Sequence, residues 1–310
     1  MATPYTNGIS SRNDTTISCE EITIPVPWGH ISGKWWGTKS VQPVIAIHGW
    51  QDNAGTFDNL APLLARDIPI LSIDLPGHGL SSHYPTGQYY YIFWDGIVVL
   101  RRIVKHFKWD KISIMGHSLG GAIAFMYAAA YPNAVDRYVS IDIASPAVRD
   151  PKEMVASIGQ NLDRFLKFET LAEENMPCYE YNEMIDLVHD AYHGSTTRQA
   201  CEVLMKRGMR PASTGKGYSF TRDMRLKVSS LAYATLEQVL QLASRITCNV
   251  MNIRANPGMK WTIPEHYDLV LDEITKSASR MERHVVPGMH HLHLNNAESV
   301  APIIRKFLLE

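Results

Sequence analysis

The five residues 116–120, Gly-His-Ser-Leu-Gly, constrain what this chain can fold into more than any other stretch. They follow a short apolar run at 112–115 and lead into a segment rich in glycine and alanine. A strand, a sharp turn and a helix in this order predict a nucleophile elbow, in which a strained central serine stands free above the edge of a sheet. We therefore expect Ser118 to be a nucleophile, with Gly116 and Gly120 leaving room for the turn.

Short apolar runs recur along the chain, and segments of helix length separate them. Such runs are typical of strands covered on both faces, as in a parallel sheet, and their alternation with helices predicts an α/β fold with right-handed crossovers. Residues 21–26 and 31–37 predict two antiparallel strands at the sheet edge, where prolines are tolerated. The expected buried strands are 44–47, 70–73, 112–115, 138–141, 250–253 and 283–286, and the expected helices are 56–66, 88–107, 119–131, 264–276 and 297–308.

The alternation stops after Ile143. From Ala144 to about Ile246 the sequence shows helical patterns and one loop rich in glycine and serine. A helical stretch between two buried strands is most simply an insertion, a cap (lid) over the carboxyl edge of the sheet. The expected cap helices are 151–168, 180–193 and 195–207. The expected division is a flexible lead-in at 1–20, a core formed by 21–143 and 247–310, and a helical cap at 144–246.

Composition narrows the class of protein. A hydrophobic content of 45% and a charged content of 20% are ordinary for a soluble globular enzyme. The net charge of −1 gives no electrostatic reason to expect nucleic acid or an anionic membrane as a partner. No apolar run is long enough to span a membrane. The polar N-terminus and four scattered cysteines without a C-x-x-C pair predict a cytoplasmic protein without a disulfide framework. The sequence predicts no particular oligomeric state.

Two loops are expected to support the elbow. An elbow nucleophile needs a second backbone N–H group aimed at the developing charge, from the loop after the first parallel strand. There the sequence reads His48-Gly49-Trp50, so the N–H groups of Trp50 and Leu119 are the expected oxyanion donors. Trp50 and His117 also lie near enough in sequence to contact substrate. The loop 74–81, Asp-Leu-Pro-Gly-His-Gly-Leu-Ser, is expected to have a structural role.

A serine hydroxyl becomes a good nucleophile when a neighbouring imidazole takes its proton. In elbow enzymes that histidine comes last in the chain, and here His290, His291 and His293 follow the last expected strand. Three close histidines raise the question of a metal ion. Their spacing lacks an i, i+4 pair and an accompanying cysteine, so we expect no zinc site, and no metal or organic cofactor is predicted.

These motifs in this order resemble the α/β-hydrolase superfamily, from about Glu21 to the end of the chain. The resemblance implies a mostly parallel twisted sheet flanked by helices, with a helical cap inserted after the sixth strand. Within the superfamily, three segments are similar to the serine hydrolase-like proteins of animals, the Kraken-type group. These segments are 48–54, 220–223 and 290–294.

The resemblance also implies roles for particular residues. It implies Ser118 as nucleophile, with Trp50 and Leu119 as oxyanion donors. The register of Glu298 with the glutamate that follows the family's catalytic histidine makes His290 the base. His291 is the second choice, and His293 is expected to pack or to line the pocket.

The third member of the triad is missing from its usual place. In most members an acid follows the strand after the cap, where this chain has Asn256 and no carboxylate. Some branches, including certain haloalkane dehalogenases and the Renilla-type luciferases, place the acid at the end of the strand before the cap. Asp142 stands there, as a charge that would be costly to bury without a partner. We predict Asp142 as the acid; Asn256 is the rival, since an amide can also orient a histidine. Asp142 could instead cap the first cap helix or pair with Arg149.

The function expected from this site is cleavage of small to medium carboxylic esters by a serine hydrolase, through an acyl-enzyme intermediate. A thioesterase or amidase, or a non-hydrolytic small-ligand receptor that keeps the pocket, is the alternative. The vacant acid position favours the receptor. A serine at the elbow argues against epoxide hydrolase, dehalogenase and luciferase chemistry, because those members need a carboxylate there. Aromatic and methionine residues of the cap, among them Met184, indicate an apolar substrate group but equally fit a cap core.

Overall fold

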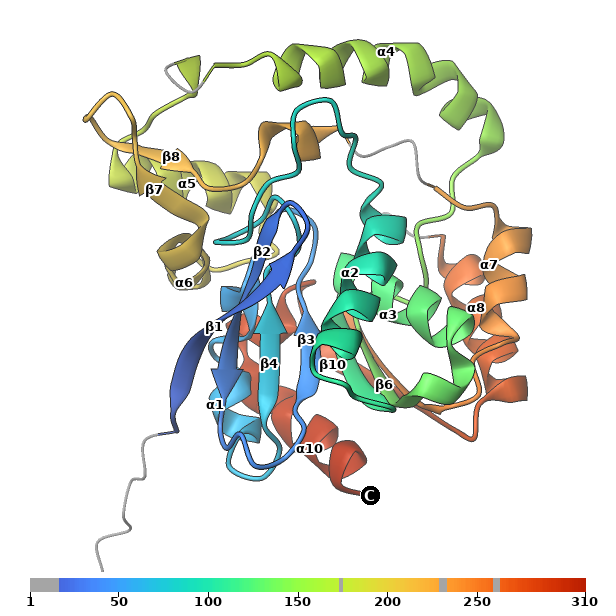
Figure 1. Cartoon of the computed structure of the whole chain (residues 1–310). Helices are drawn as coiled ribbons and strands as arrows, with labels where there is room; N and C mark the ends of the chain where they lie inside the picture. The colour runs from blue at the N-terminus through green and yellow to red at the C-terminus, as the bar shows by residue number, and fades with distance from the viewer. Residues whose placement is uncertain (1–16, 173–174, 229–232, 259–262) are drawn as a thin grey trace, which may run out of the picture.

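An eight-stranded sheet forms the centre of the computed structural model, which describes residues 17–172, 175–228, 233–258 and 263–310 (Figure 1). Its strand order is β1-β2-β4-β3-β5-β6-β9-β10. Strands β1 and β2 are antiparallel to each other, β2 is antiparallel to β4, and the rest run parallel, as predicted. The strands are β1 (Cys19–Val26), β2 (Gly29–Trp36), β3 (Val44–Ile47), β4 (Ile70–Ile73), β5 (Ile112–His117), β6 (Val135–Ile141), β9 (Asn249–Pro257) and β10 (Arg280–Gly288). Most of the expected lead-in lies outside the described residues.

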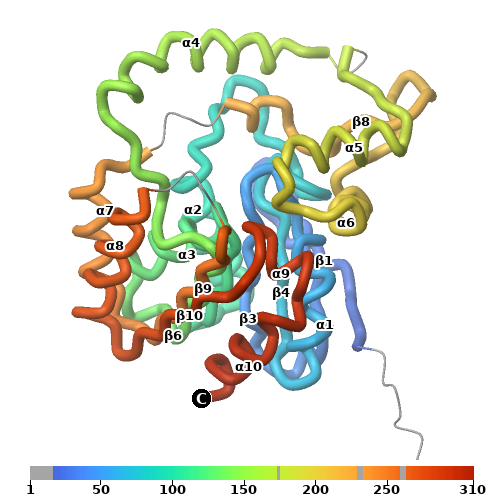
Figure 2. Tube along the Cα trace, turned by 180° about the vertical axis from the view of Figure 1, so that it is seen from behind, coloured from blue at the N-terminus to red at the C-terminus, as the bar shows by residue number. Residues whose placement is uncertain are grey.

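Helices cover both faces of the sheet (Figures 1 and 2). Strand β3 explains why, because successive side chains of a strand point to opposite faces. Ile45 and Ile47 belong to the apolar cluster on one face, and Val44 and Ala46 to the cluster on the other. The first cluster contains α2 (Ile92–His106), α3 (Leu119–Ala130), α7 (Leu236–Ala243) and α8 (Pro264–Ser277), and the second contains α1 (Ala61–Leu64) and α10 (Ala301–Leu309).

Two predicted helices are divided at a proline. The helix expected at 56–66 is a 3₁₀ helix, η1 (Ala54–Phe57), followed by α1, whose first turn contains Pro62. The helix expected at 297–308 is likewise η6 (Ala297–Ser299) followed by α10, whose first turn contains Pro302. The predictions of single helices were wrong because proline lacks an N–H and clashes with the preceding turn, so it starts a helix rather than continuing one.

The chain enters the cap after the sixth strand, β6, as predicted. Helices α4 to α6 lie beyond the carboxyl ends of the parallel strands (Figure 1). No helix of the described chain, not even α4 with its 19 residues, is long and apolar enough to cross a membrane. The cap elements are α4 (Pro151–Glu169), α5 (Tyr181–Ala191), α6 (Arg198–Gly208), β7 (Met209–Pro211), β8 (Tyr218–Phe220) and η4 (Met224–Lys227).

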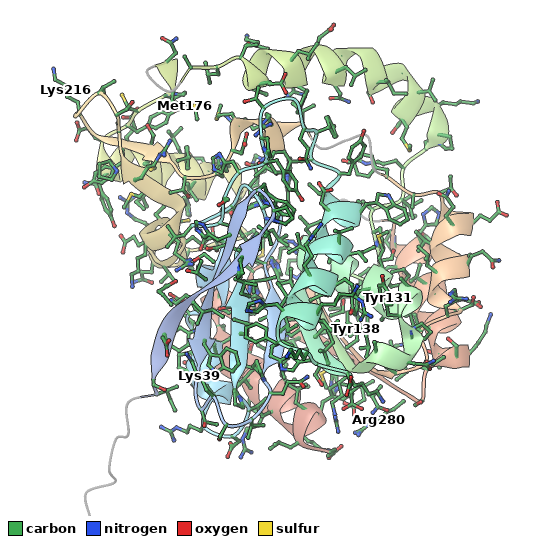
Figure 3. All side chains as sticks on the ribbon, viewed as in Figure 1. Lys39, Tyr131, Tyr138, Met176, Lys216 and Arg280 are labelled. Atoms are coloured by element: carbon green, nitrogen blue, oxygen red, sulfur yellow. The ribbon has the colours of Figure 1, made fainter. Side chains whose placement is uncertain are left out.

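A two-stranded hairpin in the cap was not predicted. Strands β7 and β8 pair antiparallel, and the glycine- and serine-rich loop of the sequence is their turn. Lys216 stands at its tip, far from the sheet (Figure 3). Further along, α7 packs its buried Val239 and Ala243 into the cluster of α3 and α8. The division of the chain into core and cap at 143 and 247 stays a prediction.

The cap has an apolar core of its own, and one residue of the main domain joins it. Met184 is fully buried there, so this side chain packs within the cap. Leu294, which comes from the segment that follows β10, is also fully buried in this cluster. The cluster is formed by Met184, Ile185, Val188, Ala200, Cys201, Leu204, Met205 and Leu294.

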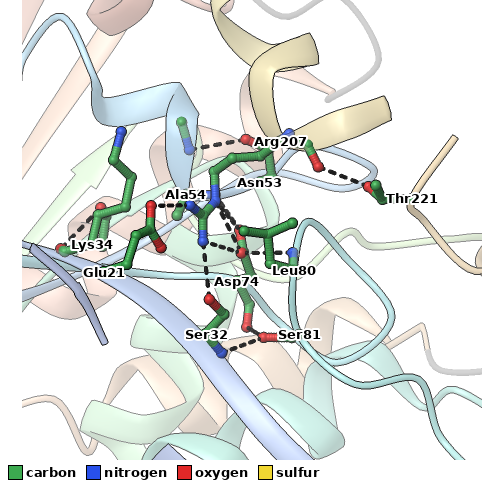
Figure 4. A network of polar contacts seen from close by, with 12 residues as sticks. Glu21, Ser32, Lys34, Asn53, Ala54, Asp74, Leu80, Ser81, Arg207 and Thr221 are labelled. Atoms are coloured by element: carbon green, nitrogen blue, oxygen red, sulfur yellow. Dashed lines mark hydrogen bonds and ion pairs between the residues drawn. The ribbon is translucent and has the colours of Figure 1, made fainter. Parts of the chain in front are cut away.

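A buried ion pair joins the cap to the sheet (Figure 4). Arg207 of α6 donates to Asp74, at the end of β4, with Nη2 2.7 Å from Oδ2, and the same nitrogen lies 3.1 Å from Ser32 Oγ in β2. The Asp74 carboxylate also accepts from the N–H groups of Ala54 (2.7 Å) and Leu80 (2.9 Å). Asp74 is fully buried and Arg207 nearly so. The loop after β4 therefore has a structural role, as expected.

Replacing Arg207 with methionine should lower the free energy of unfolding by about 3–5 kcal/mol, because Asp74 would be left as a buried charge without its partner. The matched control is Arg198→Met on the same helix. Arg198 pairs with Asp186 at the surface, and an exposed pair contributes about 0–1 kcal/mol. Urea unfolding of both variants measures the difference, and equal losses would contradict the proposed anchoring role of Arg207.

Candidate active site

Ser118 occupies a strained turn between β5 and α3. Its φ is 50° and its ψ is −118°, a conformation that non-glycine residues rarely adopt and that defines the elbow. A Cβ atom on Gly116 would lie 2.3 Å from the backbone of Gly120, and one on Gly120 would lie 1.9 Å from the carbonyl oxygen of Ile47. Both positions therefore require glycine. The Ser118 N–H donates to the carbonyl of Ile141 (3.1 Å) and so ties the turn to β6.

Asp142 follows β6 directly and contacts His290, in the segment after β10. Its Oδ2 accepts from His290 Nδ1 at 2.7 Å, and its Oδ1 accepts from the Ala255 N–H at 2.8 Å. The Asp142 N–H donates to the carbonyl of Ile253 at 2.7 Å. Both side chains are buried. A proton on Nδ1 leaves Nε2 of His290 as the basic nitrogen. Burial lowers the pKa of His290, and the hydrogen bond to Asp142 opposes this.

The rival for this contact lies elsewhere. Asn256 is exposed within β9, where its register partner is Pro287 of β10. The structure therefore brings Asp142 to His290 and leaves Asn256 on the sheet. The suggestion that Asp142 caps the first cap helix is wrong, because the side chain of Asp150 caps α4 by accepting from two backbone N–H groups.

His117 joins the elbow to the histidine that contacts Asp142. Its Nε2–H donates to the backbone carbonyl of His290 at 3.0 Å, and the two ring centres are 4.5 Å apart. His290 is thus held next to the residue that precedes Ser118. His117 itself has no exposed surface. The contacts of His117 given above are with another residue of the protein, His290. A contact between His117 and substrate therefore stays a prediction.

The loop after β3 is held by two neutral histidines. The Leu75 N–H donates to Nε2 of His48 (3.0 Å), so the Nδ1–H of His48 donates to the carbonyl of Gly49 (2.6 Å). The Gln51 N–H donates to Nε2 of His78 (3.2 Å). An accepting nitrogen must lack a proton, and burial lowers the pKa of both histidines accordingly.

The two expected oxyanion donors differ in their surroundings. Leu119 begins α3, and backbone N–H groups at a helix N-terminus favour negative charge. Trp50 is 43% exposed, and its indole Nε1–H donates to the carbonyl of Leu226 in the cap at 3.0 Å. The cap therefore holds the side chain of Trp50, and the backbone N–H group of Trp50 is the second expected oxyanion donor.

A pocket opens beside Leu119, between the core and the cap. Leu75 and His78 from the loop after β4, Tyr90 and the cap residue Leu226 complete its main walls. Its volume is about 10 Å³, which is room for about one water molecule. The lining also includes the acidic residue Asp95, and any group larger than one water molecule requires the walls to move.

Sequence reasoning missed one buried residue of this region, Asp52. Its Oδ2 lies 3.4 Å from His291 Nε2 and 3.6 Å from His117 Nδ1, and its Oδ1 accepts from the hydroxyl of Tyr192. His291 therefore faces Asp52 rather than Asp142. Nearby, His293 is fully buried with Nε2 2.9 Å from Thr56 Oγ1. No local spacing could signal this cluster, because Asp52 follows β3, His117 ends β5 and His291 follows β10.

Comparison with known proteins agrees with this fold. The model of the alpha/beta hydrolase fold family matches residues 42–297. The chain is 51% identical to a "Probable serine hydrolase" of Drosophila melanogaster over 310 residues, covering 99% of this chain and 94% of the relative. It is 34% identical to a "Serine hydrolase-like protein" of Danio rerio, covering 97% of this chain and 93% of the relative.

Solved structures give the same picture. A hypothetical protein of Pseudomonas aeruginosa superimposes with a TM-score of 0.82 at 30% identity, covering 94% of this chain and 100% of the other. A thioesterase domain from the curacin biosynthetic pathway has a TM-score of 0.78 at 20% identity, covering 94% and 100%, and shows the fold alone. The chain belongs to the α/β-hydrolase fold family. Within it, the chain resembles the animal serine hydrolase-like proteins, and these relatives support a hydrolase.

Proposed function

We propose that this protein is a serine hydrolase that cleaves carboxylic esters of small to medium size through an acyl-enzyme intermediate. The observation that carries the proposal is the 2.7 Å contact between His290 Nδ1 and Asp142 Oδ2, next to a strained Ser118. A nucleophile, a base and a group that orients the base are the three parts that activated-serine chemistry needs.

In this mechanism His290 Nε2 takes the proton of Ser118 as its Oγ attacks the ester carbonyl. Asp142 holds the imidazole in the required tautomer and stabilises its positive form. The N–H groups of Trp50 and Leu119 stabilise the oxyanion. The protonated His290 then gives its proton to the departing alcohol, and afterwards it activates a water molecule that releases the acid.

The alternatives use parts of the same site. A thioesterase or amidase would need the same nucleophile and base, and would differ only in the leaving group. A small-ligand receptor was favoured by the missing acid after the strand that follows the cap. The carboxylate of Asp142 beside His290 supports an enzyme over a receptor.

We assign this activity to the cytoplasm, on a small-molecule ester and without a nucleic-acid partner. The net charge of −1 gives no electrostatic reason for a nucleic-acid partner. All four cysteines are free, with Cys201 and Cys248 buried and Cys19 and Cys178 exposed, which fits a reducing compartment.

A fluorophosphonate probe should label Ser118 with one equivalent per chain, because the probe reacts with serines activated by a neighbouring base. Intact-protein mass spectrometry followed by peptide mapping gives the stoichiometry and the position. Ser118→Ala is the control and should take up none. A wild-type protein that stays unlabelled would favour the receptor.

Replacing Asp142 with asparagine should lower kcat on p-nitrophenyl acetate by about 10⁴-fold, since an amide selects the wrong tautomer of the catalytic histidine. Asn256→Ala should leave kcat nearly unchanged, because Asn256 is exposed on β9. Thermal unfolding of both variants checks that the fold is kept. The opposite pattern, with Asp142→Asn active and Asn256→Ala inactive, would make Asn256 the orienting group.

We take the pocket beside Leu119 as the acyl site. Short acyl chains should then be the better substrates, because the pocket has room for about one water molecule and each larger group requires more movement of its walls. A series of p-nitrophenyl esters should give the highest kcat/KM at acetyl or propionyl. Leu226→Ala removes part of a wall and should move the optimum to longer chains. Val239→Ala, an equally buried change in α7, should leave the optimum in place; a shared shift would indicate general loosening of the fold.

A further inference from the structure

Three side chains from distant parts of the sequence converge below the elbow. Asp52 follows β3, His117 ends β5 and His291 lies after β10. Asp52 Oδ2, His117 Nδ1 and His291 Nε2 all lie within 4.8 Å of one another. Each of the three side chains is at most 4% exposed.

We propose that Asp52, His117 and His291 bind one divalent transition-metal ion of the zinc class. The separations of Asp52 Oδ2 from the two histidine nitrogens, 3.4 and 3.6 Å, are long for hydrogen bonds. Zinc bonds of about 2.0–2.2 Å in tetrahedral geometry put two ligand atoms about 3.3–3.5 Å apart. The two histidine nitrogens lie within 4.8 Å of each other, so their rings would have to move together by up to about 1.4 Å to reach the spacing of a tetrahedral ion.

The hydrogen bonds of His117 fix which of its atoms face inward. Its Nε2 lies 3.0 Å from the carbonyl oxygen of His290, and a carbonyl can only accept, so Nε2 carries the proton. In the neutral ring Nδ1 then presents a lone pair, and it presents this lone pair to the carboxylate of Asp52. Two buried electron-rich atoms then face each other, an arrangement that a cation between them would stabilise.

The outward atoms of the other two ligands are also engaged. His291 Nδ1 lies 2.5 Å from Ser195 Oγ, and Asp52 Oδ1 accepts from the hydroxyl of Tyr192. Metal-binding histidines and carboxylates characteristically use their outer atoms in this way, which fixes tautomer and orientation. Ser195 and Tyr192 both belong to the cap.

Two of the three inward atoms, Asp52 Oδ2 and His117 Nδ1, are by contrast buried without a hydrogen-bond partner among the described residues. A buried polar atom without a partner is destabilising, and one ion would bind both atoms together with His291. The adjacent backbone leaves space for this, since a Cβ on Gly49 would lie 3.0 Å from each of the two unpartnered atoms.

Two imidazoles and one carboxylate set the class of ion. Imidazole suits zinc, copper, iron and nickel, whereas magnesium prefers a shell of oxygen atoms. The bound ion would link the loop after β3, the elbow and the segment after β10. Because Tyr192 contacts Asp52 and Ser195 contacts His291, it would also link these three parts to the cap. It would act as a structural tie below Ser118. The spacing of the histidines at 290–293 predicted no zinc site, because local spacing gives no sign of ligands that meet only where strands from distant parts of the chain lie side by side.

Untagged full-length protein, stripped with a chelator, should bind one equivalent of Zn²⁺ in isothermal titration calorimetry. Zn²⁺ should raise the unfolding temperature in a concentration-dependent way, and Mg²⁺ at equal concentration should not. Co²⁺ should give visible absorption bands of a low-symmetry nitrogen and oxygen site, saturating at one equivalent. Asp52→Asn and His291→Gln should weaken Zn²⁺ binding by more than about 100-fold, beyond the loss typical of outer partners.

Matched controls separate this site from other histidines and from the proposed catalysis. His293→Gln removes a buried histidine of the same region that is not a ligand, and it should keep one-equivalent binding. Ser118→Ala should also bind Zn²⁺ while losing fluorophosphonate labelling. Unchanged binding in Asp52→Asn and His291→Gln would overturn the proposal. If those variants fail to fold, absence of the one-equivalent Co²⁺ signal in the wild-type protein would overturn it instead.

Discussion

The site depends on one close backbone contact, between the first turn of α3 and the end of β3. A Cβ on Gly120 would lie 1.9 Å from the carbonyl oxygen of Ile47, so the helix can approach the strand only because residue 120 has no side chain. This approach sets the height of Ser118 above the sheet and places Leu119 beside the loop that carries Trp50. The strained φ of Ser118 is tolerated because the surrounding strands leave the turn no alternative.

The proposed acid, Asp142, lies at the end of β6, whereas the usual place in the family is after the next strand of the sheet. The geometry explains why both positions can serve. Strands β6 and β9 are neighbours in register, and the Asp142 N–H donates to Ile253 while its Oδ1 accepts from Ala255. A carboxylate can therefore start from either strand end and meet the same imidazole, which comes from the segment after β10.

Local rules predicted much of the fold, and long-range contacts account for what was missed. The apolar runs and the strand–turn–helix of the elbow could be predicted from sequence because each depends on neighbours along the chain. Asp142 was predicted from the family resemblance, and the structure places it beside His290, 148 positions away; its role as the acid stays a prediction. The breaks at Pro62 and Pro302 were also readable, and overlooking proline caused those errors. Asp52, Arg207 and the β7–β8 hairpin were different. Their roles depend on partners that only the folded chain brings near, as with Arg207 and Asp74 across 133 positions.

The hydrogen bond from Trp50 to Leu226 and the insertion of Leu294 into the cap core have a consequence for how such proteins diversify. The loop of one expected oxyanion donor and the segment that carries the expected base, His290, both contact the inserted region. The cap is therefore not an interchangeable module on a finished catalytic core. A lineage that exchanges its cap to reach new substrates must change residues of the core in the same step, so new specificities are expected to arise by gradual remodelling rather than by domain exchange.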